Sequence, residues 1–171
     1  MDPPLASAPW SPDFLAQELE LLMVARAGDQ VVSFRPVHAP SLQIGWGPGR
    51  TAEDVLTAAL ARYGITPTVL HSTSWRRAGG QIVLTYLAVV EAPDPVNPNL
   101  ASEPGTRSDL VRGAATSAPA AIGIGQVLEH ALRHLAWLLG DDPAVAAALP
   151  GWAPLLREYV PAPFRELSAP R

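Results

Sequence analysis

The apolar residues of this chain recur with two different periods, and together these predict a mixed α+β fold. Segments rich in aliphatic and β-branched side chains are typical of strands, and they cover residues 19–25, 30–37, 42–46, 66–75 and 81–91. Apolar side chains spaced three and four apart are typical of helices with one buried face, and they occur over residues 51–63 and 122–139. We therefore expect a mixed β-sheet with packed helices and a helical C-terminal region, with short helices at 143–149 and 154–159.

The segment 81–91, QIVLTYLAVVE, has the strongest strand pattern, and we expect it at the centre of the sheet. A glycine-containing loop at residues 76–80 would join it to the preceding strand, and a turn at 27–29 would join the first two strands. Ser11 followed by Pro12 is typical of a helix start. A short helix over residues 14–18 is therefore expected before the first strand.

The helix predicted at 51–63 has clear start and stop signals. Thr51 can cap the first turn, and Asp54 three positions later completes a capping-box pattern. Gly64 can end the helix in the left-handed conformation. Its expected buried stripe comprises Val55, Leu56, Ala59, Leu60 and Tyr63. A glycine-rich turn at 45–49 precedes it; such a turn can bind an anion through backbone N–H groups, or it can simply connect two elements.

Three segments are rich in proline and poor in large apolar side chains. Residues 1–10 are expected to be loose, and residues 161–171 form a similar tail. Residues 92–121 predict a long mobile loop, with a short turn of helix at 108–111. The rest fits a single domain spanning 1–171, because 171 residues are enough for one sizeable core.

Composition excludes several functions. The net charge of −4 and the lack of a basic run predict no nucleic-acid partner. The chain has no Cys, which excludes disulfides and thiol catalysis. No signal peptide and no run of 18 apolar residues is present, so we expect no membrane partner and a cytoplasmic location. The 19 prolines and many alanines suggest a GC-rich, bacterial genome.

Residues 45–65, GWGPGRTAEDVLTAALARYGI, resemble the segment of Nudix domains in which a glycine turn leads into a helix ending at Gly and an aliphatic residue. Gly47 and Glu53 have the spacing of the first two positions of the Nudix signature. The resemblance covers about residues 19–91, including the order of strands and helix around this segment. It implies a Nudix-like outline for the fold.

The remaining Nudix signature is absent. Nudix enzymes carry an Arg-Glu pair and a Glu-Glu pair on this helix, and these glutamates hold magnesium against a pyrophosphate. Counting forward from Gly47, the corresponding residues are Ala61, Arg62, Ile65 and Thr66. Counting back from Gly64, they are Thr57, Ala58, Ala61 and Arg62. Both registers lose the metal-binding acids, so the resemblance implies a degenerate domain with no metal and no cofactor.

These observations favour a non-catalytic binding or protein-interaction domain whose partner is an unknown protein or small molecule. Arg50 can attract a phosphate at the helix N-terminus, and aromatic side chains beside arginine are typical of contact surfaces. The candidate ligand-binding residues are Trp46, Arg50, Glu53, Asp54, Trp75 and Arg76. The alternative is a divergent Nudix-type hydrolase of nucleoside diphosphate derivatives that uses Glu53, Asp54 and acids from the long loop.

The helix at 122–139 carries a second candidate chemistry. His130 and His134 are four residues apart, which places both rings on one helix face at a spacing that suits metal ligands. A third ligand would have to come from Glu129, His38, His71 or an acid in the tail. The simpler interpretation is a solvated face with a Glu129–Arg133 pair. The predicted polar face comprises Gln126, Glu129, His130, Arg133, His134 and Trp137.

Overall fold

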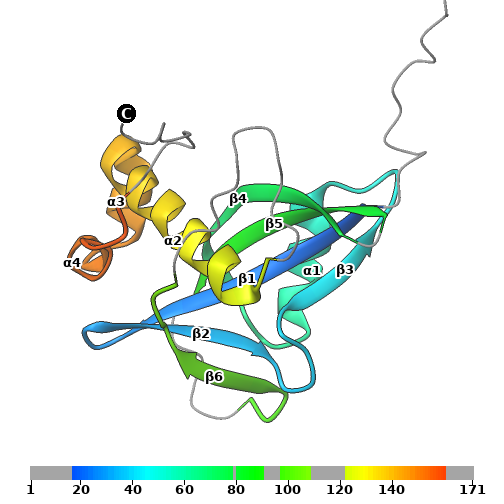
Figure 1. Ribbon diagram of the computed structural model, residues 1–171, viewed down its shortest axis with the longest axis horizontal. Helices are drawn as coiled ribbons and strands as arrows, with labels where there is room; N and C mark the ends of the chain where they lie inside the picture. The colour runs from blue at the N-terminus through cyan, green and yellow to red at the C-terminus, as the bar shows by residue number, and fades with distance from the viewer. Residues whose placement is uncertain (1–16, 79, 91–96, 109–121, 161–171) are drawn as a thin grey trace, which may run out of the picture.

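The computed structural model describes residues 17–78, 80–90, 97–108 and 122–160, which form one mixed β-sheet with helices on both faces (Figure 1). The strands are β1 (Gln17–Ala27), β2 (Gln30–Pro36), β3 (Leu42–Trp46), β4 (Pro67–Ala78), β5 (Gln81–Val90) and β6 (Leu100–Pro104). The helices are α1 (Ala52–Ala61), α2 (Ile124–Asp141), α3 (Pro143–Ala148) and α4 (Trp152–Leu155). The predicted α+β class and the helical C-terminal region are confirmed.

Strand β1 organises the sheet, because three of the described strands pair with it. The strand order is β4-β5-β1-β2-β6, and β3 also pairs with β1. Strands β2 and β3 are both antiparallel to β1 and share one of its edges: Met23 lies opposite Phe34, and Leu19 lies opposite Ile44. Strand β5 runs parallel to β1 along the other edge. The expectation of an interior position for β5 is therefore confirmed, since β4 flanks its far edge.

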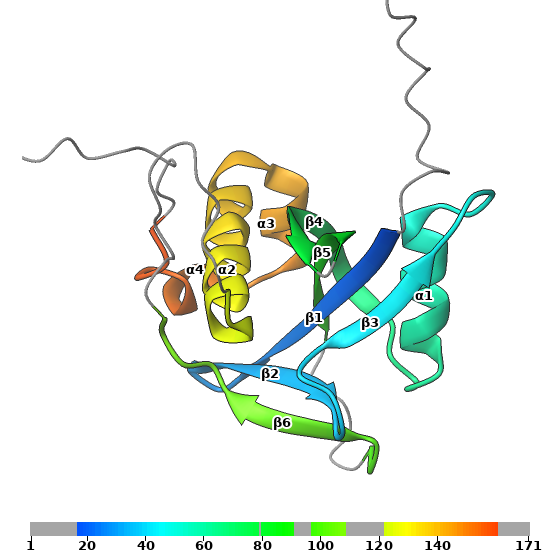
Figure 2. The same cartoon turned by 45° about the vertical axis from the view of Figure 1, so that its right-hand side comes forward.

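Helix α1 lies on one side of the sheet, and α2 and α3 lie on the other (Figure 2). Each face of the sheet carries its own hydrophobic cluster. Successive strand residues point to opposite faces. Leu22 and Val24 of β1 accordingly face the cluster built with α2, α3 and α4, whereas Leu21 and Met23 face the cluster built with α1. Burial on both faces explains why β1 is almost continuously apolar. Both faces of the sheet are thus covered, and α1 is the one described helix on its side.

The helix predicted at 14–18 is wrong for residues 17 and 18, which belong to a strand. Residues 14–16 lie outside the described residues. Gln17 and Glu18 belong to β1, where Gln17 lies opposite Trp46 of β3 and Ile82 of β5. Two partner strands extend β1 into a sequence that fits a helix equally well. Long-range pairing therefore overrides the local helix-start signal at Ser11.

The predicted loop at 76–80 is too long. Strand β4 continues to Ala78, which lies opposite Gln81, so residues 76–78 are paired with β5. Gly80 has a positive φ of 80°, a conformation that glycine adopts without strain. The turn between the strands is consequently tighter than the sequence indicated.

Part of the predicted mobile loop at 92–121 is a strand. Strand β6 pairs with β2, with Glu103 opposite Ser33, although the sequence LASEP has little strand character. Its position at the edge of the sheet accommodates Pro104 at the end of the strand. The described residues exclude 91–96 and 109–121, together with the segments predicted to be loose at 1–10 and 161–171. Most of the turn predicted at 108–111 also falls there.

The helix predictions are confirmed with shifted ends. Thr51 caps α1, and its hydroxyl accepts a hydrogen bond from the Asp54 backbone N–H. Leu56 and Leu60 are fully buried, while Tyr63 just beyond the helix is half-buried. Helix α2 begins at Ile124 and continues through Gly140 to Asp141, and α4 covers Trp152–Leu155 instead of the predicted 154–159. None of the described helices is long and apolar enough to cross a membrane.

Candidate functional site

A groove of about 620 Å³ lies between strand β3 and helix α1, beside the glycine turn that joins them. Strand β3 forms one wall, and the side of α1 that carries Val55, Ala58 and Ala59 forms the other. The lining residues are Leu42, Gln43, Ile44, Gly45, Gly47, Pro48, Arg50, Val55, Ala58, Ala59, Arg62 and Tyr63. Apolar side chains dominate the walls, which is typical of ligand sites.

Hydrogen bonds fix both ends of the groove. At one end the Trp46 indole N–H donates to the carbonyl of Arg50 at 2.8 Å, which ties the turn to the end of β3. At the other end the Asn97 amide donates to the carbonyl of Tyr63 at 2.9 Å. The same segment reaches the chain before β3, because the Val37 N–H donates to the carbonyl of Asn99 at 3.0 Å. Helix α1 therefore runs back alongside β3 toward the strand's beginning.

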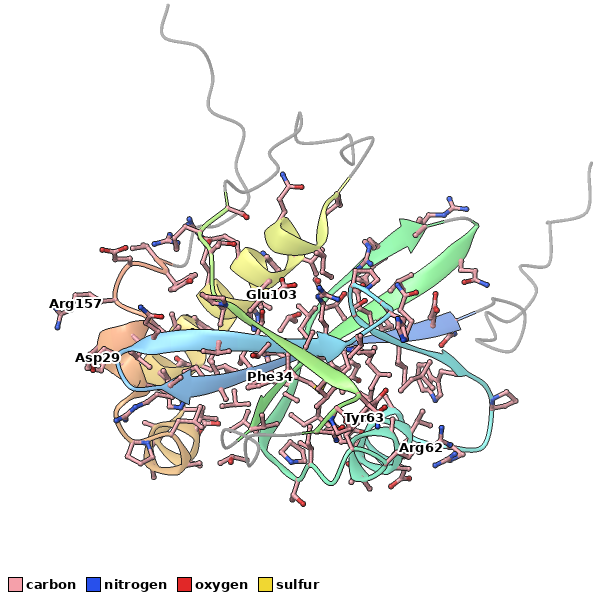
Figure 3. The ribbon with its side chains drawn as sticks, turned by 90° about the horizontal axis from the view of Figure 1, so that it is seen from below. Asp29, Phe34, Arg62, Tyr63, Glu103 and Arg157 are labelled. Carbon is pink, nitrogen blue, oxygen red and sulfur yellow. The ribbon has the colours of Figure 1, made fainter. Side chains whose placement is uncertain are left out.

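The charged side chains that line the groove are Arg50 and Arg62. Both are exposed, and neither forms an ion pair within the part of the chain that the structure describes. Figure 3 places Arg62 and Tyr63 together at the end of α1. No described carboxylate lines the groove. The two arginines have no acid beside them in the described lining, so the groove carries positive charge. Such a groove favours a negatively charged ligand.

Among the predicted site residues near the glycine turn, Arg50 lines the groove and Trp46 supports it from the end of β3. Glu53 lies in the first turn of α1 and is not part of the lining. Burial raises the pKa of Tyr86 on β5, and the negative charge of Glu53 raises it further. Asp54 is exposed at the first turn of α1 and is not part of the lining. The two acids thus lie at the helix start but do not enter the groove.

The predicted residues Trp75 and Arg76 lie on β4, apart from the groove lining. Trp75 is 67% exposed. The Arg76 guanidinium donates two hydrogen bonds to the carboxylate of Glu20, at 2.6 and 2.8 Å. Arg76 therefore neutralises an acid on β1, and the structure does not bring it together with Arg50.

Glu20 is the centre of a fully satisfied polar network. Its carboxylate is 1% exposed and also accepts hydrogen bonds from the hydroxyls of Ser41 and Thr85. Burial alone would raise the pKa of Glu20, but the hydrogen bonds and positive charge of Arg76 outweigh burial and lower it. The sequence predictions missed this residue, although an acid inside an apolar strand is a signal for such a buried pair.

Contrary to the sequence prediction, Glu129 does not lie on a solvated face of α2. This residue is 1% exposed, and its carboxylate accepts hydrogen bonds from Arg107, Arg133 and the backbone N–H of Ser108. Burial would raise the pKa of Glu129, but these donors lower it overall. The Glu129–Arg133 pair exists, but its carboxylate is buried and only the Arg133 side chain is partly exposed. Glu129 is therefore not a free third ligand for the histidines.

His134 has a different neighbour from the one expected. Its Nδ1 lies 3.0 Å from Nε2 of His71 on β4, and the two rings stack with centroids 5.0 Å apart. The His130 ring is farther away, at 6.3 Å between centroids. Burial lowers the pKa of both His71 and His134, and for His134 the neighbouring histidines lower it further. Within the described residues, no group of three or more His, Asp or Glu side chains could hold a metal ion.

The comparisons with known proteins return similarities among solved structures alone. No family model matches the chain, and no curated protein matches it. A crystal structure described as a "putative nudix hydrolase family member from Chromobacterium violaceum" is similar over 86% of this chain and 95% of its own, with 17% identity and a TM-score of 0.40. A similarity at this level says nothing about the chemistry of either chain.

Proposed function

We propose that this chain is a non-catalytic binding domain of Nudix-like outline, and that its groove between β3 and α1 takes a negatively charged ligand. The main support for this proposal is the charge of the groove lining, which contains two arginines and no described acid. An anion bound there would neutralise guanidinium groups that lack a described partner.

The same lining argues against metal-assisted hydrolysis. Magnesium needs carboxylate or phosphate oxygens arranged around an octahedron. The nearby acids, Glu53 and Asp54, lie outside the lining at the first turn of α1. Arg62 lies at the C-terminal end of α1, and its positive charge would repel a cation in the groove. These features favour binding without turnover.

Hydrolysis can be tested directly with nucleotide sugars, dinucleoside polyphosphates and oxidised nucleotides, each with Mg²⁺ or Mn²⁺. We expect no turnover above the background without protein. The variant Glu53→Gln serves as the control for contaminating activity. Metal-dependent turnover that Glu53→Gln abolishes would contradict the proposal and establish the alternative, a divergent Nudix-type hydrolase.

Anion binding can be tested with inorganic phosphate as the probe and backbone amide shifts as the measurement. We expect phosphate to shift amides around Arg50 or Arg62, and the double variant Arg50→Gln/Arg62→Gln to lose these shifts. Arg157→Gln is the matched control, because Arg157 is also exposed but lies at the other end of the molecule (Figure 3). Shifts that survive the double variant would place the anion elsewhere.

A further inference from the structure

One edge of β3 has no partner strand among the described residues. Strand β3 pairs along its other edge with β1, and no other pairing is formed by it in the described sheet. In an antiparallel pair, alternate residues turn their N–H and C=O groups away from the partner. The open edge of β3 therefore presents backbone donors and acceptors, and residues 42–45 of this strand also line the groove.

We infer that the groove binds an extended peptide, which adds to β3 as a further antiparallel or parallel strand and carries acidic side chains toward both of its ends. This inference rests on the proposed function, because it names the class of ligand that the same groove takes. Addition of a strand to a free sheet edge is a general mode of peptide recognition, in which the backbone supplies affinity and the side chains supply specificity.

The dimensions of the groove suit a short strand. The five residues of β3 span about 17 Å, and the ten residues of α1 rise by about 15 Å. The two walls therefore match over the length of a five-residue peptide. Gly45 leaves the backbone accessible, since a Cβ built there would meet no atom within 4 Å. Ala58 and Ala59 on the facing helix leave room for peptide side chains.

The placement of charge selects the ligand. Arg50 precedes α1 and Arg62 follows it, so the two arginines stand near opposite ends of the groove. A small anion would reach one arginine at a time, because the helix separates them by roughly 15 Å. An extended chain with an acid toward each end reaches both and also pairs with the strand between them. Basic side chains at those positions would be repelled, which provides specificity.

A second copy of this chain is a poorer occupant of the groove. Pairing of two β3 edges would bring the arginines of both copies to the same interface, with no described lining acid to balance them. Like charges across an interface oppose association. The charge pattern therefore fits an acidic partner better than self-association.

The test is selection from a random octapeptide library displayed on phage, against the full chain. We expect enriched peptides with Asp or Glu toward both ends and β-branched residues between them. Synthetic copies should lose binding when alternate backbone nitrogens are methylated, because methylation removes ladder donors. Bound peptide should slow amide exchange within Leu42–Trp46.

Two matched pairs of variants locate the site. Ala58→Trp fills the groove, whereas Ala61→Trp adds the same bulk at an exposed position of α1 outside the lining. We expect the first to weaken peptide binding about tenfold or more and the second to leave it within about twofold. Arg50→Glu/Arg62→Glu should likewise weaken binding about tenfold, while Arg157→Glu should not.

Three results would overturn the inference. These are no enrichment over an unrelated protein, enriched peptides that bind Ala58→Trp as well as the parent chain, or sedimentation of the parent as a dimer that Ala58→Trp dissociates. Any of these results would refute peptide binding. If phosphate-induced amide shifts are still lost in Arg50→Gln/Arg62→Gln, the proposal of an anion-binding groove would stand. Metal-dependent turnover sensitive to Glu53→Gln would instead refute the proposed function itself.

Discussion

At the scale of single residues, the buried acids decide which positions tolerate change. Glu20 and Glu129 are both nearly inaccessible, and both are neutralised by arginine. A buried ion pair contributes little compared with a well-packed apolar pair, but removal of one partner leaves an uncompensated charge. Substitution of Glu129 should therefore be more harmful than substitution of Glu158, the exposed acid that contacts the same Arg107.

Replacement of Glu129 tests this directly. Glu129→Ala removes the acceptor for Arg107 and Arg133, whose side chains are 40% and 19% exposed. We expect a loss of about 1–3 kcal/mol in the free energy of unfolding, because buried donors lose their partner. Glu158→Ala is the control, because Glu158 pairs with the same Arg107 but its side chain is 84% exposed; about 0–1 kcal/mol is expected there. Denaturant unfolding measures both, and equal losses would contradict the buried network.

Gly151 is a second sensitive position. It has a φ of 80°, and a Cβ at this site would contact the Arg26 guanidinium, which donates to the carbonyl of Pro150. We expect Gly151→Ala to destabilise the fold by at least about 1 kcal/mol, the cost of a left-handed non-glycine residue. Gly140 in α2 has open space and no positive φ, so Gly140→Ala should be neutral or stabilising by about 0.5–1 kcal/mol. A thermal melt that ranks the two variants in the opposite order would refute this account.

At the scale of elements, α1 is held to the sheet by one apolar face. Leu60 is fully buried in the cluster on that side. Leu60→Ala should cost about 2–5 kcal/mol, because it removes buried carbon and leaves a cavity. Thr57→Ala, an exposed change on the same helix, should stay within about 0.5 kcal/mol. A loss below about 0.5 kcal/mol for Leu60→Ala in denaturant unfolding would mean that α1 packs through another face.

The contact of α2 with β4 should depend on pH through His71 and His134. Burial lowers the pKa of both below the ordinary value of 6.5, so the unfolded chain binds more protons as the pH falls through that value. Stability should therefore decrease below about pH 6.5 and be unaffected by this pair above it. His134→Gln should flatten the stability curve between about pH 5 and 7. An unchanged slope, relative to the control His38→Gln, would rule out the pair as its source.

At the scale of the whole molecule, the two faces of the sheet carry different features. The face with α1 carries the open groove, whereas the face with α2, α3 and α4 carries the Glu129 network. That network joins Arg107, just beyond β6, to α2 and to Glu158 near the end of the described chain. Changes in the network should therefore alter global stability and leave ligand binding at the groove unchanged.

Acid unfolding should be steep below the ordinary carboxyl pKa of 4.5. The pKa values of Glu20 and Glu129 are lowered in the folded state, so their stabilisation is complete above that value. It is lost as the pH falls through their folded pKa values, because the unfolded chain then binds more protons. Circular dichroism between pH 2 and 6 should show this transition, and Glu129→Gln should make it shallower. A transition with the same slope in the variant would contradict the assignment.

The sequence alone determined those elements whose signals are local. The capping residue Thr51, the apolar spacing of α1 and the β-branched run of β5 are properties of neighbouring residues, so they predicted a capped helix and an interior strand without knowledge of their partners. The same helix-start signal at Thr51 placed Arg50 at the N-terminus of α1. The lack of the Arg-Glu and Glu-Glu pairs of the Nudix signature is likewise a property of the sequence by itself, because it concerns residue types at fixed positions.

Only the tertiary structure decided what depends on distant partners. Strand β6 forms because it pairs with β2, where Ser33 lies opposite Glu103, 70 positions later in the chain. Arg76 is the partner of Glu20, 56 positions away, and it does not line the groove, although the local Trp-Arg pattern had made it a candidate ligand-binding residue. The edge of β3 that has no partner among the described strands is likewise a matter of which strands pair. Pairing and burial are set by contacts across the whole chain, and no local period encodes them.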